Sequence, residues 1–141
     1  MSQNTLVERL TAAGAEVRCG KLGNVLSVNF ALESQPTRAL QAETVEGELE
    51  WLQDLGECIK CRELYLTGQP IGDSALGFLI QRMPALQVLD LDHTHVSGAI
   101  LDQVESLEKL KILSLSGTRV PDDRIREARK RLIQTRIIKL H

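Results

Sequence analysis

One motif recurs three times in the chain without gaps, and it constrains the fold more than any other feature of the sequence. The three copies share the pattern L-x-x-L-x-L-x-x-T-x-V, with small variations, and they span residues 61–73, 86–98 and 110–122. Equivalent leucines, Leu64, Leu89 and Leu113, are 25 and 24 residues apart. A regular period of this length indicates a repeat architecture in which each copy is one structural unit.

Each copy predicts a short strand followed by a turn and a helix. The leucines of L-x-L point to one side of a strand, and the residue between them points to the other. The Thr or Gln after the strand is expected to bond backbone groups as the chain turns. Apolar spacings of three and four then predict helices over Asp73–Met83, Ser97–Leu107 and Asp122–Leu132, with Ser97 and Asp122 as N-caps. The expected inward helix positions are Leu76, Leu79, Ile80, Leu101, Val104, Leu107, Ile125, Ala128 and Leu132.

The repeat predicts the fold class because a single strand and helix cannot bury both of their apolar faces alone. Stacked repeats bury these faces against one another. We therefore expect an α/β fold: a short right-handed β/α solenoid of the leucine-rich-repeat type, with a parallel concave sheet and convex helices. A partial fourth copy, Thr135–Leu140, predicts a terminal strand in which Ile138 takes the position of Leu113. On that alignment Ile137 and Lys139 lie on the concave face.

The chain is expected to be a single domain over residues 1–141, with regular repeats and the C-terminal strand in 61–141. Residues 1–60 are interpreted as an N-terminal helix and hairpin cap with an irregular first repeat, because stacked repeats require a shielded end. The elements expected in this part are a helix over Thr5–Ala13, strands over Glu16–Cys19 and Val25–Phe30, and a helix over Thr37–Leu55.

A family resemblance rests on residues from both parts of the chain. Gly14-Ala-Glu-Val17-Arg, then Gly23-Asn-Val25-Leu-Ser-Val28-Asn-Phe30, precede the L-x-L-x-x-T-x-V repeats. Together they resemble bacterial leucine-rich-repeat proteins of the T-x-V/I-[TS]-D type, which are similar to the repeat regions of F-box adaptors. The resemblance implies a role in binding other proteins.

The composition limits the classes of function and the compartment. Aromatic residues are only 3% of the chain while hydrophobic residues are 43%, so the core must be aliphatic. The formal net charge of −2 does not favour nucleic-acid binding, which usually accompanies a basic domain. No apolar run is long enough to cross a bilayer, and the N-terminus does not resemble a signal peptide. The odd number of cysteines argues against a disulfide framework, and together these features favour the cytoplasm.

The residues between the inward leucines are expected to form the binding surface. The candidates are Glu63, Tyr65, Val88, Asp90, Asp92, Ile112 and Ser114. Tyr65, Val88 and Ile112 would form a small apolar patch of the kind that anchors interfaces. The two aspartates would favour a basic group on the partner. The alternative is that these side chains only solvate the sheet.

We expect a non-catalytic protein–protein interaction module with no catalytic residue, cofactor or metal site. The sequence has no G-x-S-x-G, P-loop or G-x-G-x-x-G motif. One alternative is an enzyme, or a regulatory subunit of one, that uses the cluster Asp90, Asp92, His93 and His95. Another is a structural subunit of a larger assembly. An enclosed pocket with convergent polar groups would favour the enzyme, and an open curved wall would favour the module.

Two further features carry weaker alternatives. Cys58-Ile-Lys-Cys61 is a C-x-x-C, but zinc requires four ligands and only Cys19 remains, so buried structural cysteines are expected. The C-terminal region is basic, which predicts a solvated helix face or else a patch for an acidic partner. The last strand has a bare edge that invites pairing with another chain, but its short length and the terminal Lys139 and His141 blunt this edge. We therefore expect a monomer, with pairing of two copies through that edge as the alternative.

Overall fold

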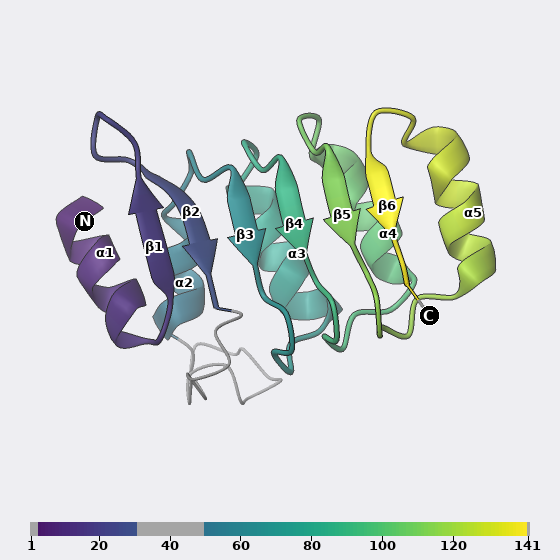
Figure 1. The fold of residues 1–141 in the computed structure, drawn as a ribbon, viewed down its shortest axis with the longest axis horizontal. Coiled ribbons are helices and arrows are strands. Elements are labelled where there is room, and N and C mark those ends of the chain that lie inside the picture. Colours follow the sequence, from purple (N-terminus) through teal and green to yellow (C-terminus); the bar gives the residue numbers. More distant parts are fainter. Residues whose placement is uncertain (1–2, 31–49, 141) are drawn as a thin grey trace.

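The computed structural model describes residues 3–30 and 50–140. These residues form one six-stranded sheet with the strands in chain order (Figure 1). A hairpin joins the first two strands in antiparallel register, and every later neighbour is parallel. The strands are β1 (Glu16–Cys19), β2 (Val25–Asn29), β3 (Glu63–Tyr65), β4 (Val88–Asp90), β5 (Ile112–Ser114) and β6 (Arg136–Ile138).

The helices α2 to α5 alternate with the parallel strands along the chain, and in the described part of the chain one face of the sheet carries no helix (Figure 1). Figure 1 shows α2, α3 and α4 behind the sheet, with α1 at its N-terminal end and α5 at its C-terminal end. Neighbouring helices contact one another in chain order. Their bounds are α1 (Gln3–Ala12), α2 (Glu50–Gly56), α3 (Asp73–Arg82), α4 (Ala99–Gln103) with the 3₁₀ turn η2 (Val104–Ser106), and α5 (Asp122–Arg131). The fold is therefore mixed α/β with helices packed alongside a mostly parallel sheet.

The predicted alignment of the repeat leucines is confirmed. Leu64 is in register with Leu89, and Leu89 with Leu113, across three adjacent parallel strands. Val28 precedes them in β2. All four side chains have no exposed surface. Eight of the nine predicted inward helix positions are also buried, and the ninth, Leu132, is partly buried against the core.

The predicted alignment of the last strand is wrong by one residue. Ile137, rather than Ile138, pairs with Leu113 and enters the core. Because side chains alternate along a strand, a shift of one residue exchanges the two faces. Arg136 and Ile138 therefore lie on the open face, in register with Ile112 and Ser114.

Helix boundaries also differ from expectation. The helix expected over Ser97–Leu107 has only a short α-helical part, α4, and closes with the 3₁₀ turn η2. Gly98, not Ser97, occupies the N-cap position of α4, although the Ala99 amide donates to Ser97 Oγ at 3.4 Å. Asp122 is the first residue of α5 rather than its N-cap. Residues 37–49 of the helix expected over Thr37–Leu55 lie outside the described residues.

Side chains after β3, β4 and β5 bond backbone carbonyls, as the sequence predicts. The hydroxyls of Thr94 and Thr118 donate to the carbonyls of Leu91 and Leu115 at 2.7 and 2.6 Å. Gln69 Nε2 donates to the carbonyl of Phe30, one strand away, at 2.9 Å. These bonds fix the turn that takes the chain from the sheet to the helix layer.

Three equivalent positions in these turns have left-handed backbone conformation. Gly68, His93 and Gly117 have φ of 78°, 59° and 72°. Glycine adopts such angles without strain because it lacks a Cβ atom. Histidine has a Cβ atom, so the same angles are strained for it. His93 therefore carries backbone strain at a position where both neighbouring repeats have glycine.

The N-terminal elements are tied to the rest of the molecule by an ion pair. Arg9 Nε of α1 lies 3.0 Å from Asp54 Oδ2 of α2, and the Asp54 side chain is only 7% exposed. Leu6 and Leu10 of α1 are buried against the core that also contains Leu55. The predicted cap helix thus packs as part of the same core. No helix in the described ranges combines the length and apolar character that a bilayer crossing demands.

Candidate functional site

Six of the seven predicted binding residues lie together on the open face of the sheet. They form two rows that cross adjacent strands. In the first row Glu63, Val88 and Ile112 are in register and continue to Arg136, and in the second Tyr65, Asp90 and Ser114 continue to Ile138. These residues alternate with the buried leucines, so their side chains face away from the helix layer. The strands that carry them lie side by side in the sheet (Figure 1).

The middle of the first row is apolar. Val88 and Ile112 are neighbours across β4 and β5, and the Ile112 side chain is 37% exposed although it lies in a strand. Ile138 adds a half-buried aliphatic side chain on β6, and Tyr65 a half-buried aromatic one on β3. Val88 and Ile112 stand opposite one another and are close enough to make contact. Tyr65 lies opposite Asp90, one diagonal step from Val88. Among the described residues, the surface thus offers a small and partly exposed apolar patch.

Charged side chains flank the patch, and several of them, such as Arg18 and Arg136, were not predicted. Arg18 Nη2 of β1 lies 3.6 Å from Glu63 Oε1 of β3, and the Tyr65 hydroxyl donates to the same oxygen at 3.1 Å. Glu16 and Arg18 pair with Asn29 and Ser27 of the hairpin partner β2. The alternation of a hairpin strand is the signal that could have placed Arg18 on this face.

Asp90 is the acidic residue of this face with a perturbed pKa. Burial raises the pKa of its carboxyl above the ordinary value, and the Asp92 carboxylate adds to the rise. The Asp92 amide donates to Asp90 Oδ1 at 3.0 Å, and this bond, with one to the Thr67 side chain, opposes the rise. The charged form of Asp90 is thus held at a cost beside the apolar patch.

Replacing Asp90 with asparagine is expected to raise the free energy of unfolding at about pH 7 and to leave it nearly unchanged at about pH 3. A carboxyl whose pKa is higher in the folded state stabilises the fold below its unfolded pKa, and this contribution is lost as the pH rises through the folded pKa. Asparagine cannot ionise and still presents an acceptor oxygen to the Asp92 amide. Urea unfolding at the two pH values checks this, and a loss of stability at the higher pH would contradict it.

Asp92 and Ser114 bond to one another and to the turns. Asp92 follows β4, and its Oδ1 atom accepts hydrogen bonds from Ser114 Oγ at 2.6 Å and from the Ser116 amide at 2.8 Å. The next equivalent residue repeats this arrangement, because Ser116 Oγ accepts from the Leu140 amide at 2.8 Å. Asp92 and Ser114 therefore link adjacent repeats. Of the two predicted aspartates, only Asp90 belongs to the rows on the open face.

The histidines near Asp92 do not converge with it on a site. His93 and His95 are exposed in the turn that leaves β4, and the His93 ring packs over Gly117 of the next repeat. Within the described ranges, no three His, Cys, Asp or Glu side chains are grouped in a way that could hold a metal ion. The four residues of the enzyme alternative are therefore dispersed. Asp90 lies on β4, the two histidines lie in the turn, and Asp92 bonds to the next repeat.

Cys58 and Cys61 are buried, as the sequence predicts. The Cys58 thiol donates to the Asp54 carbonyl at 3.5 Å, and the Cys61 thiol to the Glu63 carbonyl at 3.3 Å. Burial raises the pKa of both thiols to about 12. Since the thiolate is the reactive form, neither cysteine is suited to redox or nucleophilic chemistry in the folded protein.

A chromogenic disulfide reagent is expected to titrate Cys19 in the native protein and all three thiols after denaturation, because Cys19 is exposed and the other two are buried. The variant Cys19→Ser should leave almost no rapid phase. A rapid reaction of Cys58 or Cys61 in that variant would contradict the buried assignment.

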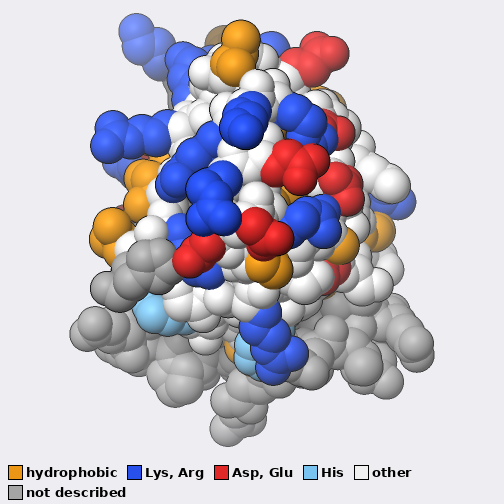
Figure 2. Space-filling model, turned by 90° about the vertical axis from the view of Figure 1, so that its right-hand side faces the viewer, with side chains coloured by type: hydrophobic (Ala, Val, Ile, Leu, Met, Phe, Trp, Pro, Cys, Tyr) orange, Lys and Arg blue, Asp and Glu red, His pale blue; other side chains and the backbone are white. Residues whose placement is uncertain are grey.

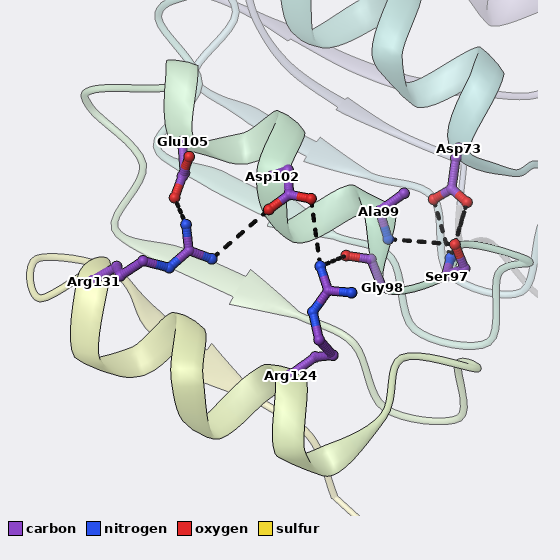
Figure 3. Close-up of polar contacts among 8 residues, drawn as sticks. All are labelled: Asp73, Ser97, Gly98, Ala99, Asp102, Glu105, Arg124 and Arg131. Carbon is purple, nitrogen blue, oxygen red and sulfur yellow. Dashed lines mark hydrogen bonds and ion pairs between the residues drawn. The ribbon is translucent and has the colours of Figure 1, made fainter.

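The basic C-terminal helix is partly neutralised by its neighbour. Arg124 Nη2 lies 3.4 Å from Asp102 Oδ2 and donates to the Gly98 carbonyl, and Arg131 pairs with Asp102 and Glu105 of the preceding repeat (Figure 3). Figure 2 views this end of the molecule and shows Lys and Arg interspersed with Asp and Glu. These contacts match the reading of a solvated helix face better than that of a uniform basic patch.

The outer edge of β6 is partly covered by side chains. Arg129 Nη2 of α5 donates to the Ile137 carbonyl at 2.8 Å, which occupies an acceptor of this edge. Lys139 Nζ donates to the Val120 carbonyl and lies 3.3 Å from Asp122 Oδ1. Side chains that occupy or charge an edge strand oppose its pairing with another chain.

No protein-family model matches the chain, and no curated protein matches its sequence. Its function therefore has to be inferred from the surface of the molecule itself.

Proposed function

We propose that the α/β fold is a short right-handed leucine-rich-repeat solenoid, related to the bacterial proteins that its sequence resembles. Three features support this. The repeat leucines share one register. The left-handed turn recurs at Gly68, His93 and Gly117. Strand-to-strand connections through a helix are right-handed in nearly all proteins. In this reading the open sheet face is the concave wall and the helices form the convex side.

We infer that the chain is a non-catalytic module that binds another protein on this concave wall. One observation carries the inference: Val88 and Ile112 are apolar neighbours on an open sheet face, with Tyr65 diagonal to Val88 and with Glu63 and Asp90 beside them. An apolar centre with a polar rim is the usual anatomy of a protein interface. An open wall of this kind differs from the concave pocket that encloses a small substrate.

The same residues specify the chemistry of the partner. An aliphatic or aromatic side chain of the partner would cover Val88 and Ile112, and a Lys or Arg beside it would pair with Asp90. The raised pKa of Asp90 supports a functional role, because a surface carboxylate that costs stability at neutral pH is typical of a functional site. Once a partner excludes water, this ion pair gains strength from the lower local dielectric constant.

Site-specific crosslinking in cells that make the protein tests this function. With Ile112 replaced by p-benzoylphenylalanine, irradiation is expected to give a discrete crosslinked product. That product should disappear with Asp90→Lys and persist with Asp123→Lys, a matched charge reversal on the exposed start of α5. The same photoreactive residue at Glu127 on α5 serves as a control for position. A product insensitive to Asp90→Lys, or common to both crosslinker positions, would reject this face.

We further infer that the isolated chain is a monomer, because Arg129 and Lys139 occupy or charge the outer edge of β6. Light scattering at rising protein concentration should give a constant monomer mass. A mass that doubles, and does so more readily in Arg129→Ala, would instead favour pairing of two copies through β6. That result would also revive the alternative of a structural subunit in a larger assembly.

A further inference from the structure

The edge of the sheet at the amino ends of the parallel strands is hollowed. This edge is formed by the β1–β2 hairpin and by the loops that enter β3 to β6, and it is the upper edge in Figure 1. Two clefts lie along it, with volumes of about 480 and about 600 Å³. Gln87 and Lys109 line both clefts, so the two adjoin. We call the pair the amino-edge groove.

The ionisable side chains that line this groove are nearly all basic. They are Lys21, Lys60, Arg62, Lys109 and Lys111, with Glu108 as the one acid among the lining residues. The chain as a whole has a net charge of −2, so this edge has the opposite sign to the molecule. A hollow lined by one sign of charge concentrates ligands of the other sign.

These cations also lack the partners that the basic C-terminal helix has. Arg124 and Arg131 of α5 pair with acidic residues of the preceding repeat. In the part of the chain that the structure describes, none of the five groove cations lies within ion-pair distance of a carboxylate. Their charge is thus available to a ligand.

The groove is apolar as well as basic. Leu26 and Ala85 line the first cleft and Leu110 the second, and Leu22 stands at the rim with 89% of its surface exposed. Asn24, Gln87 and Gln134 add amide groups that can bond a peptide backbone. A ligand that satisfies this lining combines negative charge, aliphatic side chains and backbone amides.

The length of the groove matches a short extended segment. It runs from the β1–β2 hairpin to the loop that enters β6. Neighbouring strands are about 4.8 Å apart, so the span from β2 to β6 is about 19 Å, which accommodates about six residues of extended chain. The described residues that line the groove include no aromatic side chain. A single-stranded nucleic acid would therefore find no stacking platform there.

We propose that the amino-edge groove binds an extended acidic peptide segment of a protein partner. Asp or Glu side chains of the segment pair with Arg62 and the lysines, and an intervening aliphatic side chain packs against Leu22, Leu26 and Ala85. This site is separate from the concave wall, so it does not depend on the function proposed there.

Fluorescence anisotropy with a labelled peptide of alternating Glu and Leu tests the proposal at low ionic strength. Saturable binding is expected, weakened by salt and absent for the Gln–Leu analogue. The double variant Arg62→Glu, Lys109→Glu should weaken binding about tenfold or more, since close opposite charges are replaced by like charges. The control Arg126→Glu, Lys130→Glu makes the same change in net charge on exposed positions of α5 and should bind like the parent chain.

Circular dichroism and thermal unfolding establish that both double variants are folded. If the groove variant is unfolded, the salt dependence and the comparison with the Gln–Leu peptide, both measured on the parent chain, still test the proposal. The proposal is overturned if the Glu–Leu peptide does not saturate, if its neutral analogue binds equally, or if both double variants lose affinity alike. Binding of phosphatidylserine vesicles or a single-stranded oligonucleotide without binding of the peptide would also overturn it and would name the other occupant.

Discussion

Replacing Leu89 with alanine is expected to lower the free energy of unfolding by about 3 to 5 kcal/mol. Leu89 lies in the central strand of the repeats, with Leu64 on one side and Leu113 on the other, and none of the three side chains has exposed surface. The substitution removes buried methyl groups and leaves a cavity that its neighbours can only partly fill. Because β3 and β5 flank Leu89 and the helix layer packs over it, the surrounding side chains have little freedom to move into the cavity.

Urea denaturation followed by circular dichroism measures this loss, and Leu22→Ala provides the control. Leu22 is 89% exposed, so removing its side chain should change the free energy of unfolding by less than about 0.5 kcal/mol. A smaller truncation is Ile137→Val, which removes one carbon from β6, a strand with a neighbour on only one side. It should cost about 1 kcal/mol or less. A loss below about 1 kcal/mol for Leu89→Ala would contradict the packing of the central repeat.

The same leucines explain how much of the fold could be read from the sequence. A strand has one buried face, so a leucine period of 25 and 24 residues fixes which residues of β3, β4 and β5 are neighbours. At β6 this signal is ambiguous, because Ile137 and Ile138 are adjacent and both are apolar. Only the packing of α5 and β5 selects Ile137 for the core.

Helix ends were less predictable for a similar reason. The apolar residues Ile100, Leu101 and Val104 fit an α-helix that continues to Leu107, and they are buried as such a helix would require. The chain instead closes with a 3₁₀ turn at Val104–Ser106. A turn of this type keeps nearly the same residues on the inner face, so the apolar period does not distinguish it from a last α-helical turn.

The sequence predicts which residues of the candidate site lie on the open face, but it does not predict the contacts that they make. Alternation along β3, β4 and β5 places Tyr65, Asp90 and Ile112 outward, and it would have added Arg18 had the hairpin been aligned. The bonds from Ser114 and the Ser116 amide to Asp92 depend on distances between repeats, which no pattern along the chain contains. The amino-edge groove is partly encoded in the repeat, because Arg62 and Lys111 take equivalent positions in their copies, as do Lys60 and Lys109.

Replacing Gly117 with alanine is expected to cost about 2 to 3 kcal/mol of folding free energy, for two reasons that add. A residue with a Cβ atom at φ of 72° is strained. That Cβ would also lie 2.1 Å from Nδ1 of His93, so the imidazole ring would have to leave its position. Gly68→Ala separates the two contributions, because Gly68 has φ of 78° and no atom within 4 Å of the added carbon. It should cost only about 1 to 2 kcal/mol.

The variant His93→Gly completes the comparison as a double-mutant cycle. In that background the ring is gone, so Gly117→Ala should cost no more than Gly68→Ala does in the parent chain. The difference between the two costs of Gly117→Ala then measures how strongly the His93 ring is held by the next repeat. Equal costs in both backgrounds would mean that the ring moves aside freely. The strained backbone of His93, with φ of 59°, would then not be linked to a packing contact with the next repeat. A lower cost without His93 would show that adjacent repeats are coupled through their turns as well as through their leucines.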